Sequence, residues 1–320
     1  MSKVRSLLLI ATLALPQLAC AARPAPVAPE AARPAVAAKP APGSAEAQKR
    51  SINANRAMQY LKEIVAFGPR ADGSQGMKKQ QQYLRAKLKD DHLEEDVFTA
   101  DTPAGKFEMR NLIAKFPGSQ DGIIVVASHY DTLYSVKNFV GANDGGSSTA
   151  LLLELANQLR GQKLNGPSVW LVFFDGEEAF RNWTSTDSVY GSRHLAARWQ
   201  QDGTNKKIKA FLLADMIGDA DLNIDRDQNS TKWLQELVYQ AASNLGYQSH
   251  FYERTGPFDD DHIPFGKAGV PVVDLIDLNY GYGNVFWHTP QDTIDKISPK
   301  SLQITRDTIL ETIRLLDERK

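Results

Sequence analysis

The amino-acid sequence predicts an α/β fold with three layers, α/β/α, around a central mixed and mostly parallel sheet. Continuous apolar runs at 123–128, 169–174 and 208–214 are typical of strands that are buried on both faces. Segments with helical spacing alternate with these runs, which is the pattern of a sheet covered by helices. The 320 residues are 42% hydrophobic and 23% charged, which is ordinary for one large globular domain or two small ones.

The start of the chain predicts a targeting segment. Basic residues precede an apolar run at 7–15, and small residues follow it. Because this run is too short to cross a bilayer, residues 1–21 are expected to be a secretory signal peptide. The only cysteine, Cys20, lies in a context that resembles a bacterial lipobox. A lipoprotein leader with a membrane tether through lipidated Cys20 is therefore an alternative to ordinary cleavage near Ala21 or Ala22.

An Ala- and Pro-rich segment at 22–46 follows the leader. Such a composition cannot bury a core and predicts an extended linker. The folded domain is expected over 47–320. Leader and linker together predict an exported protein, which in a bacterium would be periplasmic, tethered to the outer membrane or extracellular.

The first half of the domain predicts helices at 47–66, 76–89 and 147–159, and strands at 97–99, 111–116 and 123–128. Apolar residues at helical spacing predict the first helix, which Gly68-Pro69 ends. Short apolar runs predict the strands. A polar loop bounded by glycine follows at 129–143, and a leucine-rich run after small residues predicts the helix that comes next.

The second half predicts strands at 169–174, 208–214 and 270–276, and helices from Tyr190 or Ser192 to 200, at 231–245 and at 299–318. Each strand is a mostly apolar run of the length that buried strands have, although Lys209 and Asp274 interrupt two of them. The helices fill the segments between these strands and close the domain.

Acidic residues and histidines follow the expected strands. They are His129 and Asp131 after 123–128, Asp144 in a turn of small residues, Glu177 and Glu178 after 169–174, Asp215 after 208–214, and His288 before the last helix. Because the carboxyl ends of parallel strands meet at one edge of a sheet, these side chains are expected to lie close together. Each has a structural alternative when taken singly, such as a solvated loop for Glu177-Glu178 or a helix N-cap for Asp144.

The combined donor set predicts a catalytic metal. Two neighbouring carboxylates cannot both stay ionised in a buried place without a cation or a shared proton. Imidazole and carboxylate ligands without a thiolate suit Zn²⁺ in a site that keeps one position open. Glu178 would then be a ligand, and the adjacent Glu177 would serve as general acid and base.

The order of these motifs resembles the co-catalytic zinc aminopeptidase family, of the bacterial leucyl aminopeptidase-like kind, over about residues 50–320. The shared pattern is His-x-Asp, Gly-x-x-Asp, Glu-Glu, Asp and His-Thr-x-x-Asp. This resemblance implies a zinc-exopeptidase-like fold in which Glu177 moves protons. It implies one or two zinc ions on His129, Asp144, Glu178, Asp215 and His288.

A narrower resemblance is to the glutaminyl-peptide cyclotransferases of the animal type. It rests on 175–196, which contains Asp-Gly-Glu-Glu-Ala-Phe and Trp183, and on 260–265, 269–272 and 287–289. This resemblance implies a single zinc on Asp144, Glu178 and His288. It assigns catalysis to Glu177, Asp215 and Asp260, and substrate binding to Trp183, Trp287, Asp259, Asp274 and Phe286.

The chain also departs from that family. Asp274 stands where the family usually has His, and Asp259 stands where it usually has Gln. The cysteine pair common in the animal enzymes is absent, and the segments 145–147 and 289–293 look more like the peptidases. His262 is expected to have a supporting or structural role.

The expected reaction is cyclisation of an N-terminal glutamine of a peptide or protein to pyroglutamate, with release of ammonia. One zinc is expected, and a second on His129 and Asp215 is the alternative. Two zinc ions would indicate the alternative function, a secreted aminopeptidase that hydrolyses peptide N-termini. A third alternative is a catalytically silent binding domain, and measuring the zinc content would separate it from both enzymes. The net charge of −1 gives no reason to expect nucleic acid as a partner, and a monomer is expected.

Overall fold

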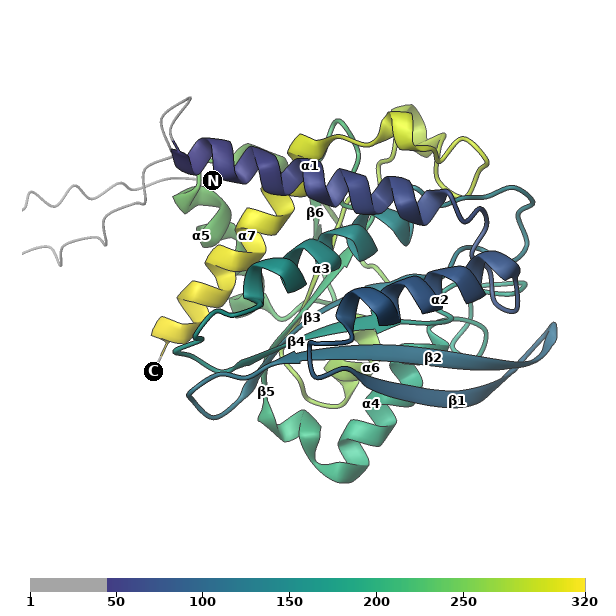
Figure 1. Ribbon diagram of the computed structural model, residues 1–320, viewed down its shortest axis with the longest axis horizontal. Helices are drawn as coiled ribbons and strands as arrows, with labels where there is room; N and C mark the ends of the chain where they lie inside the picture. The colour runs from purple at the N-terminus through teal and green to yellow at the C-terminus, as the bar shows by residue number, and fades with distance from the viewer. Residues whose placement is uncertain (1–44, 320) are drawn as a thin grey trace, which may run out of the picture. The chain divides into compact units, whose positions relative to one another are not determined.

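A computed structural model of the chain describes residues 45–319 (Figure 1). The predicted signal peptide and nearly all of the linker, with Cys20, lie outside the described residues, so their prediction is untested. Among the described residues, no helix is both long and apolar enough to cross a membrane.

The central sheet has six strands in the order β1-β2-β4-β3-β5-β8. They are β1 Glu94–Thr102, β2 Gly105–Phe116, β3 Ile123–His129, β4 Ser168–Phe174, β5 Ile208–Asp215 and β8 Val272–Ile276. The four strands β4, β3, β5 and β8 are parallel, whereas β1 and β2 form an antiparallel hairpin at one edge. The predicted mixed and mostly parallel sheet is thus confirmed.

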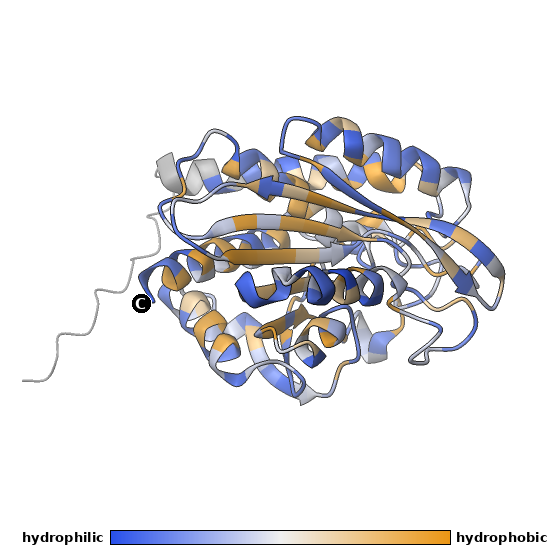
Figure 2. Cartoon of the chain, turned by 90° about the horizontal axis from the view of Figure 1, so that it is seen from below, coloured by the Kyte–Doolittle hydropathy of each residue, from blue (hydrophilic) through white to orange (hydrophobic). Residues whose placement is uncertain are grey.

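Helices cover both faces of this sheet (Figure 1). On one face lie α1 Ala45–Val65, α2 Gln75–Leu88, α3 Gly146–Leu159, α5 Lys232–Asn244 and α7 Pro299–Glu318, and on the other lie α4 Tyr190–Asp202 and α6 His262–Lys267. Successive residues of a strand point to opposite faces, so Ile124 and Val126 join the larger core cluster while Val125 and Ala127 join the smaller one. Figure 2 shows the resulting largely orange strands in the middle and covering helices that carry both orange and blue residues.

The structure adds elements that the sequence pattern did not predict. The strands expected at 97–99 and 111–116 are the middle of β1 and the end of β2, which form a longer hairpin. A second sheet pairs β6 Ile224–Asp227 with β7 Phe251–Gly256 in parallel. The six-residue α6 was also not predicted.

The parallel strands β3, β4, β5 and β8 end at the same edge of the sheet. His129 is the last residue of β3 and Asp215 the last of β5, and Glu177 and Glu178 come just after β4. The candidate site therefore lies at the carboxyl edge of the parallel strands, as expected for open α/β sheets.

Candidate active site

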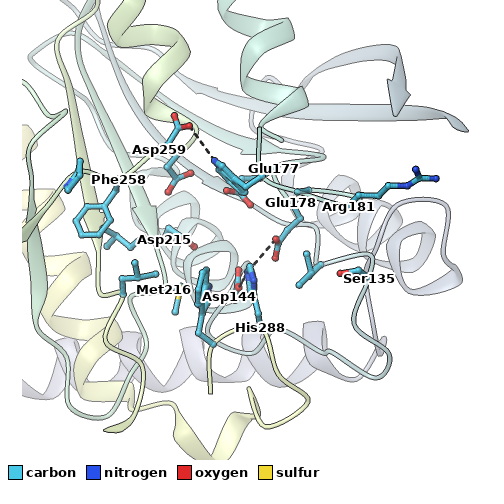
Figure 3. Close-up of a pocket in the computed structure, with 18 residues that line it drawn as sticks. Ser135, Asp144, Glu177, Glu178, Arg181, Asp215, Met216, Phe258, Asp259 and His288 are labelled. Atoms are coloured by element: carbon cyan, nitrogen blue, oxygen red, sulfur yellow. Dashed lines mark hydrogen bonds and ion pairs between the residues drawn. The ribbon is translucent and has the colours of Figure 1, made fainter. Parts of the chain in front are cut away.

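A cavity of about 490 Å³ opens at this edge of the sheet. Its lining includes the acidic residues and the histidine that the sequence singled out, namely Asp144, Glu177, Glu178, Asp215, Asp259, Asp260 and His288. Figure 3 shows Asp144, Glu177, Glu178 and His288 lying close together, with Phe258 and Met216 on the wall beside Asp215. The cavity thus combines a polar floor with apolar walls, which is typical of sites for small or extended ligands.

Two sets of three side chains could each hold a metal ion, and they share Asp144. One set is Asp144, Glu178 and His288, and the other is His129, Asp144 and Asp215. In the first set, His288 Nε2 lies 3.3 Å from Asp144 Oδ2 and 3.5 Å from Glu178 Oε2. In the second set, His129 Nε2 lies 3.3 Å from Asp144 Oδ1 and 3.0 Å from Asp215 Oδ1.

The first set fits a metal by an independent criterion. Both carboxylate oxygens of Glu178 and Oδ2 of Asp144 are buried without a hydrogen-bond partner. Buried polar atoms are rarely left unpaired, because an unpaired one costs free energy. Atoms that bind one tetrahedral zinc at about 2.0 Å lie roughly 3.3 Å apart, which matches the two separations from His288 Nε2 in this set.

Asp131 fixes the backbone of the two glutamates. Its Oδ1 accepts a hydrogen bond from the Glu177 N–H at 3.1 Å, and its Oδ2 accepts one from the Glu178 N–H at 3.1 Å. Its Oδ1 also lies 3.5 Å from His129 Nδ1, which orients the imidazole. Nothing in the sequence pattern indicated the contacts of Asp131 with Glu177 and Glu178.

Asp292 fixes the turn that carries Asp144 in the same way. Its two oxygens accept the backbone N–H groups of Asn143 at 2.8 Å and Asp144 at 3.1 Å. The next residue, Gly145, has a φ of 72°, and a Cβ there would lie 2.5 Å from the carbonyl oxygen of Asp131. Only glycine therefore fits this turn, which explains the small residues around Asp144.

Arg70 supports the same loop, and the sequence analysis assigned it no role. Its side chain is fully buried, and its guanidinium donates to the carbonyl oxygens of Val140 and Gly141. Its backbone N–H donates to Thr132 Oγ1 at 2.8 Å. Arginine therefore ties the two ends of the loop between β3 and α3 together.

The cavity contains more acidic than basic side chains. Burial is the main reason that the pKa of Glu177 is raised well above its ordinary value; His129 opposes this shift and Asp260 adds to it. Burial also raises the pKa of Asp260 to about 7, and the charge of Asp215 contributes. Burial opposes a low pKa for Asp144, but contacts with His129 and His288 hold that pKa below its ordinary value. A group with a raised pKa beside a candidate metal set is suited to transfer protons near neutral pH.

Two tryptophans stand at the mouth of the cavity. Trp183 and Trp287 both line it, and they remain 39% and 38% exposed. The Trp183 indole N–H donates to Asp259 Oδ2 at 3.3 Å, and the Trp287 ring stacks on His288 with centroids 4.1 Å apart. Both rings therefore present apolar surface to the cavity.

The remaining residues predicted to bind substrate lie elsewhere. Asp274 is fully buried on β8 and is not among the residues that line the cavity. Phe286 also does not line it, and packs edge to face against Tyr280 at 5.4 Å. Trp183, Trp287 and Asp259 thus line the cavity, whereas Asp274 and Phe286 do not.

Comparison with known proteins gives relatives of two kinds. Residues 111–313 match the model of peptidase family M28. The chain is 33% identical over 274 residues to the glutaminyl-peptide cyclotransferase-like protein of Mus musculus, which covers 76% of this chain and 70% of the mouse protein. It is 35% identical over 256 residues to the glutaminyl-peptide cyclotransferase of Boiga irregularis, covering 66% of this chain and 68% of the snake protein.

Solved structures give the same two kinds of relative. A glutaminyl cyclase from an Acidobacteriales bacterium superimposes with a TM-score of 0.82 and 48% identity, covering 92% of this chain and 100% of that one. A Zn-dependent exopeptidase from Parabacteroides distasonis superimposes with a TM-score of 0.72 and 25% identity, covering 83% of this chain and 98% of the other. The fold is thus shared by cyclases and exopeptidases.

Proposed function

The chain belongs to peptidase family M28, and from this premise we propose that it is a zinc-dependent glutaminyl-peptide cyclotransferase. The enzyme converts the N-terminal glutamine of peptides or proteins to pyroglutamate and releases ammonia. The observation that carries this proposal is the buried Glu177 beside the set formed by Asp144, Glu178 and His288, in a cavity that Trp183 lines.

Zinc is the ion that suits this site. Asp144, Glu178 and His288 offer two carboxylates and an imidazole, and three protein ligands with one open position are typical of catalytic zinc. When bound, zinc polarises the γ-carboxamide carbonyl of the substrate and stabilises the negative charge that develops on its oxygen.

Glu177 moves the proton in this reaction. The α-amine nitrogen of the substrate attacks the carbonyl carbon of its own side-chain amide, and Glu177 takes a proton from that nitrogen. Glu177 then gives the proton to the departing nitrogen, which leaves as ammonia, so the carboxylate is regenerated. The raised pKa of Glu177 makes it a strong enough base for the first transfer and a ready acid for the second.

The rest of the cavity orients the substrate and excludes water. Asp260 and Asp215 lie in the same acidic cluster as Glu177, where they hold the amine and share protons with it. Because the nucleophile and the electrophile belong to one molecule, correct orientation supplies a large part of the rate acceleration. Trp183 and Trp287 cover the mouth and so suppress hydrolysis.

We propose one zinc per chain, with His129 as a cation in place of a second metal. Burial would lower the pKa of His129, but the charges of Glu177 and Asp215 raise it well above its ordinary value. The resulting imidazolium lies between Asp144 and Asp215 and neutralises part of the acidic cluster. His129 and Asp215 then need no second ion.

A zinc aminopeptidase is the second candidate function, and one observation favours it. The ligand atoms of His129, Asp144 and Asp215 lie within 4.8 Å of one another, so a second ion that shares Asp144 also fits. A hydroxide between two ions is the nucleophile of such peptidases. Incubating the purified enzyme with matched Gln-peptides and Leu-peptides and weighing the products by mass spectrometry decides between the two. Loss of one ammonia from the Gln-peptide supports the cyclase, whereas release of free amino acids contradicts it.

We further propose export, with the leader at 1–21 and a flexible linker at 22–46, and either free secretion or a tether through lipidated Cys20. The composition of these segments supports this proposal. Cell fractionation and mass analysis of the mature N-terminus test it: an intact leader on cytoplasmic enzyme would contradict export, and limited proteolysis of the linker should leave activity intact. We also propose that the enzyme is a monomer, which its elution volume on a sizing column tests.

A further inference from the structure

One wall of the cavity consists of four successive residues, Pro257, Phe258, Asp259 and Asp260. This segment connects β7 to α6 and contributes Asp260, the acidic partner of Glu177, and Asp259, the partner of Trp183. The segment has no regular secondary structure of its own over most of its length. Contacts from outside the segment must therefore hold it in place.

The buried carboxylate of Asp227, at the end of β6, makes the central contacts. Its Oδ1 accepts hydrogen bonds from the Phe258 N–H at 3.1 Å and the Asn229 N–H at 3.0 Å. Its Oδ2 accepts one from the Ser230 hydroxyl at 2.7 Å and lies 3.1 Å from His262 Nε2. Asp227 is 1% exposed, and it is not in contact with Glu177, the metal set or the other residues proposed to act on the substrate.

These contacts lie on both sides of the catalytic residues. Phe258 precedes Asp259-Asp260-Asp261 in the chain, and His262 follows it as the first residue of α6. A single carboxylate therefore bonds to one end of the segment that carries Asp260 and lies against the other. The neighbouring Asn229 reinforces the first end, since its side-chain amide donates to the Phe258 carbonyl at 2.7 Å.

The charge of Asp227 matters for this arrangement. Three donors bond to Asp227, from Phe258, Asn229 and Ser230, and hydrogen bonds to an ionised acceptor are stronger than neutral ones. Burial opposes ionisation, but His262 and the backbone donors hold the pKa of Asp227 below its ordinary value. On its other side, His262 Nδ1 lies 3.8 Å from Asp274, so this imidazole sits between two buried acids.

We propose that Asp227 is a positioning residue for the reaction: it sets the place of Asp260 and Asp259 in the cavity wall and makes no contact with substrate. The inference rests on the proposed cyclisation only for the identity of the reaction. The wall lines the cavity whichever reaction takes place there.

The test is Asp227→Asn, which keeps the shape of the side chain and the acceptor at Oδ1 but turns the other oxygen into a donor. This new donor faces His262. Displacing the wall by a fraction of an ångström to an ångström is expected to lower kcat/KM by about 10- to 100-fold. Both a rise in KM and a fall in kcat are expected, while the zinc content stays at the wild-type value because the metal set comes from other loops.

Asp96→Asn is the matched control. Asp96 is also a buried carboxylate beside a histidine, since its Oδ2 lies 3.0 Å from His194 Nδ1 and accepts from the Asn111 amide at 2.8 Å. It lies on β1 and does not line the cavity. A comparable fall in melting temperature with wild-type kcat and KM is expected for this variant, when activity is assayed well below melting.

A second variant covers the case in which Asp227→Asn does not fold. Asn229 is exposed, so Asn229→Ala should fold normally while losing the contact with Phe258. A several-fold rise in KM with unchanged zinc is expected. The inference is overturned if folded Asp227→Asn has kcat/KM within 2-fold of wild type (about 0.4 kcal/mol), if Asp96→Asn loses as much activity, or, where Asp227→Asn is unfolded, if Asn229→Ala is unchanged.

The wild-type product separates this inference from the proposed function. If the wild-type enzyme releases free amino acids rather than ammonia, the proposed cyclisation fails. The same variants compared on the hydrolytic reaction then still decide whether Asp227 positions the wall.

Discussion

Replacing Asp131 with asparagine removes the negative charge that holds both glutamates of the active site. Each of its oxygens accepts one backbone N–H, from Glu177 and from Glu178, both at 3.1 Å. In Asp131→Asn one acceptor becomes an NH₂ group, which points at an N–H and cannot bond to it. One charge-assisted hydrogen bond is lost and a buried donor is left unpaired, so the free energy of unfolding should fall by about 2–4 kcal/mol.

The effect on function should exceed the effect on stability. Groups that hold metal ligands in place typically change metal affinity or activity by about 10- to 100-fold when they are replaced. Because Glu178 is a proposed ligand and Glu177 the proposed base, we expect weaker zinc binding and a kcat about 100-fold lower even at saturating zinc. Zinc titration with a competing chelator and steady-state kinetics on a Gln-peptide measure the two effects.

Asp187→Asn is the matched control for this prediction. Asp187 accepts the backbone N–H groups of Phe180 at 2.9 Å, Arg181 at 3.0 Å and Asn182 at 3.1 Å, so it supports the loop just after the two glutamates in the same manner. A similar loss of stability with wild-type zinc affinity is expected. If Asp131→Asn keeps wild-type zinc affinity and a kcat within about 3-fold of wild type (~0.7 kcal/mol), the argument that Asp131 positions the glutamates is wrong.

Further outcomes follow from the same site. Glu177→Gln should lower kcat by about 10²- to 10⁴-fold with zinc content unchanged, and near-normal turnover would assign the proton transfer to another group. His288→Ala should release zinc on dialysis and lose activity that added Zn²⁺ restores only in part; a fully active metal-free enzyme would contradict a role for zinc. The acid limb of the kcat/KM profile should lie above the ordinary glutamate pKa, because Glu177 has a raised pKa and must be deprotonated to accept a proton. Burial and the charges of Asp260 and Asp227 raise the pKa of Asp274 well above its ordinary value, so Asp274 stabilises the fold at low pH and this contribution is lost as the pH rises. Asp274→Asn should therefore raise the melting temperature at pH 8 more than at pH 4, and an equal shift at both would refute this.

The buried part of the fold could be predicted because its signal is local. The runs expected at 123–128, 169–174 and 208–214 match β3, β4 and β5 to within a residue at each end, since strands covered on both faces need apolar side chains throughout. The ends of these strands then located the metal set, because parallel strands bring their carboxyl ends together. Asp144 was found through the small residues that its turn requires.

The parts of the fold that could not be predicted depend on contacts between segments that are distant in the sequence. β6 contains Asp225 and Asp227, both buried, and its sequence resembles a surface loop until their partners are known. Asp225 pairs with Arg254, and Asp227 with the segment around Phe258. Tertiary pairing of this kind leaves no periodic signal in the sequence.

The position of the Asp274 side chain likewise could not be predicted from the sequence. The sequence placed it at a position that resembles a substrate pocket, whereas the structure places its side chain behind the wall, 3.8 Å from His262 Nδ1. Whether a side chain on a strand points into the cavity or behind it depends on a twist and register that the sequence alone does not specify.

Zinc stoichiometry and product identity, measured on one sample of active enzyme, test the central claim most directly. Metal analysis of the purified protein is combined with mass spectrometry of the peptide products and an ammonia assay. We predict one zinc per chain, held by Asp144, Glu178 and His288, together with pyroglutamyl peptide and an equal amount of ammonia. Two tightly bound zinc ions with free amino acids as products would contradict this account and identify the enzyme as an aminopeptidase.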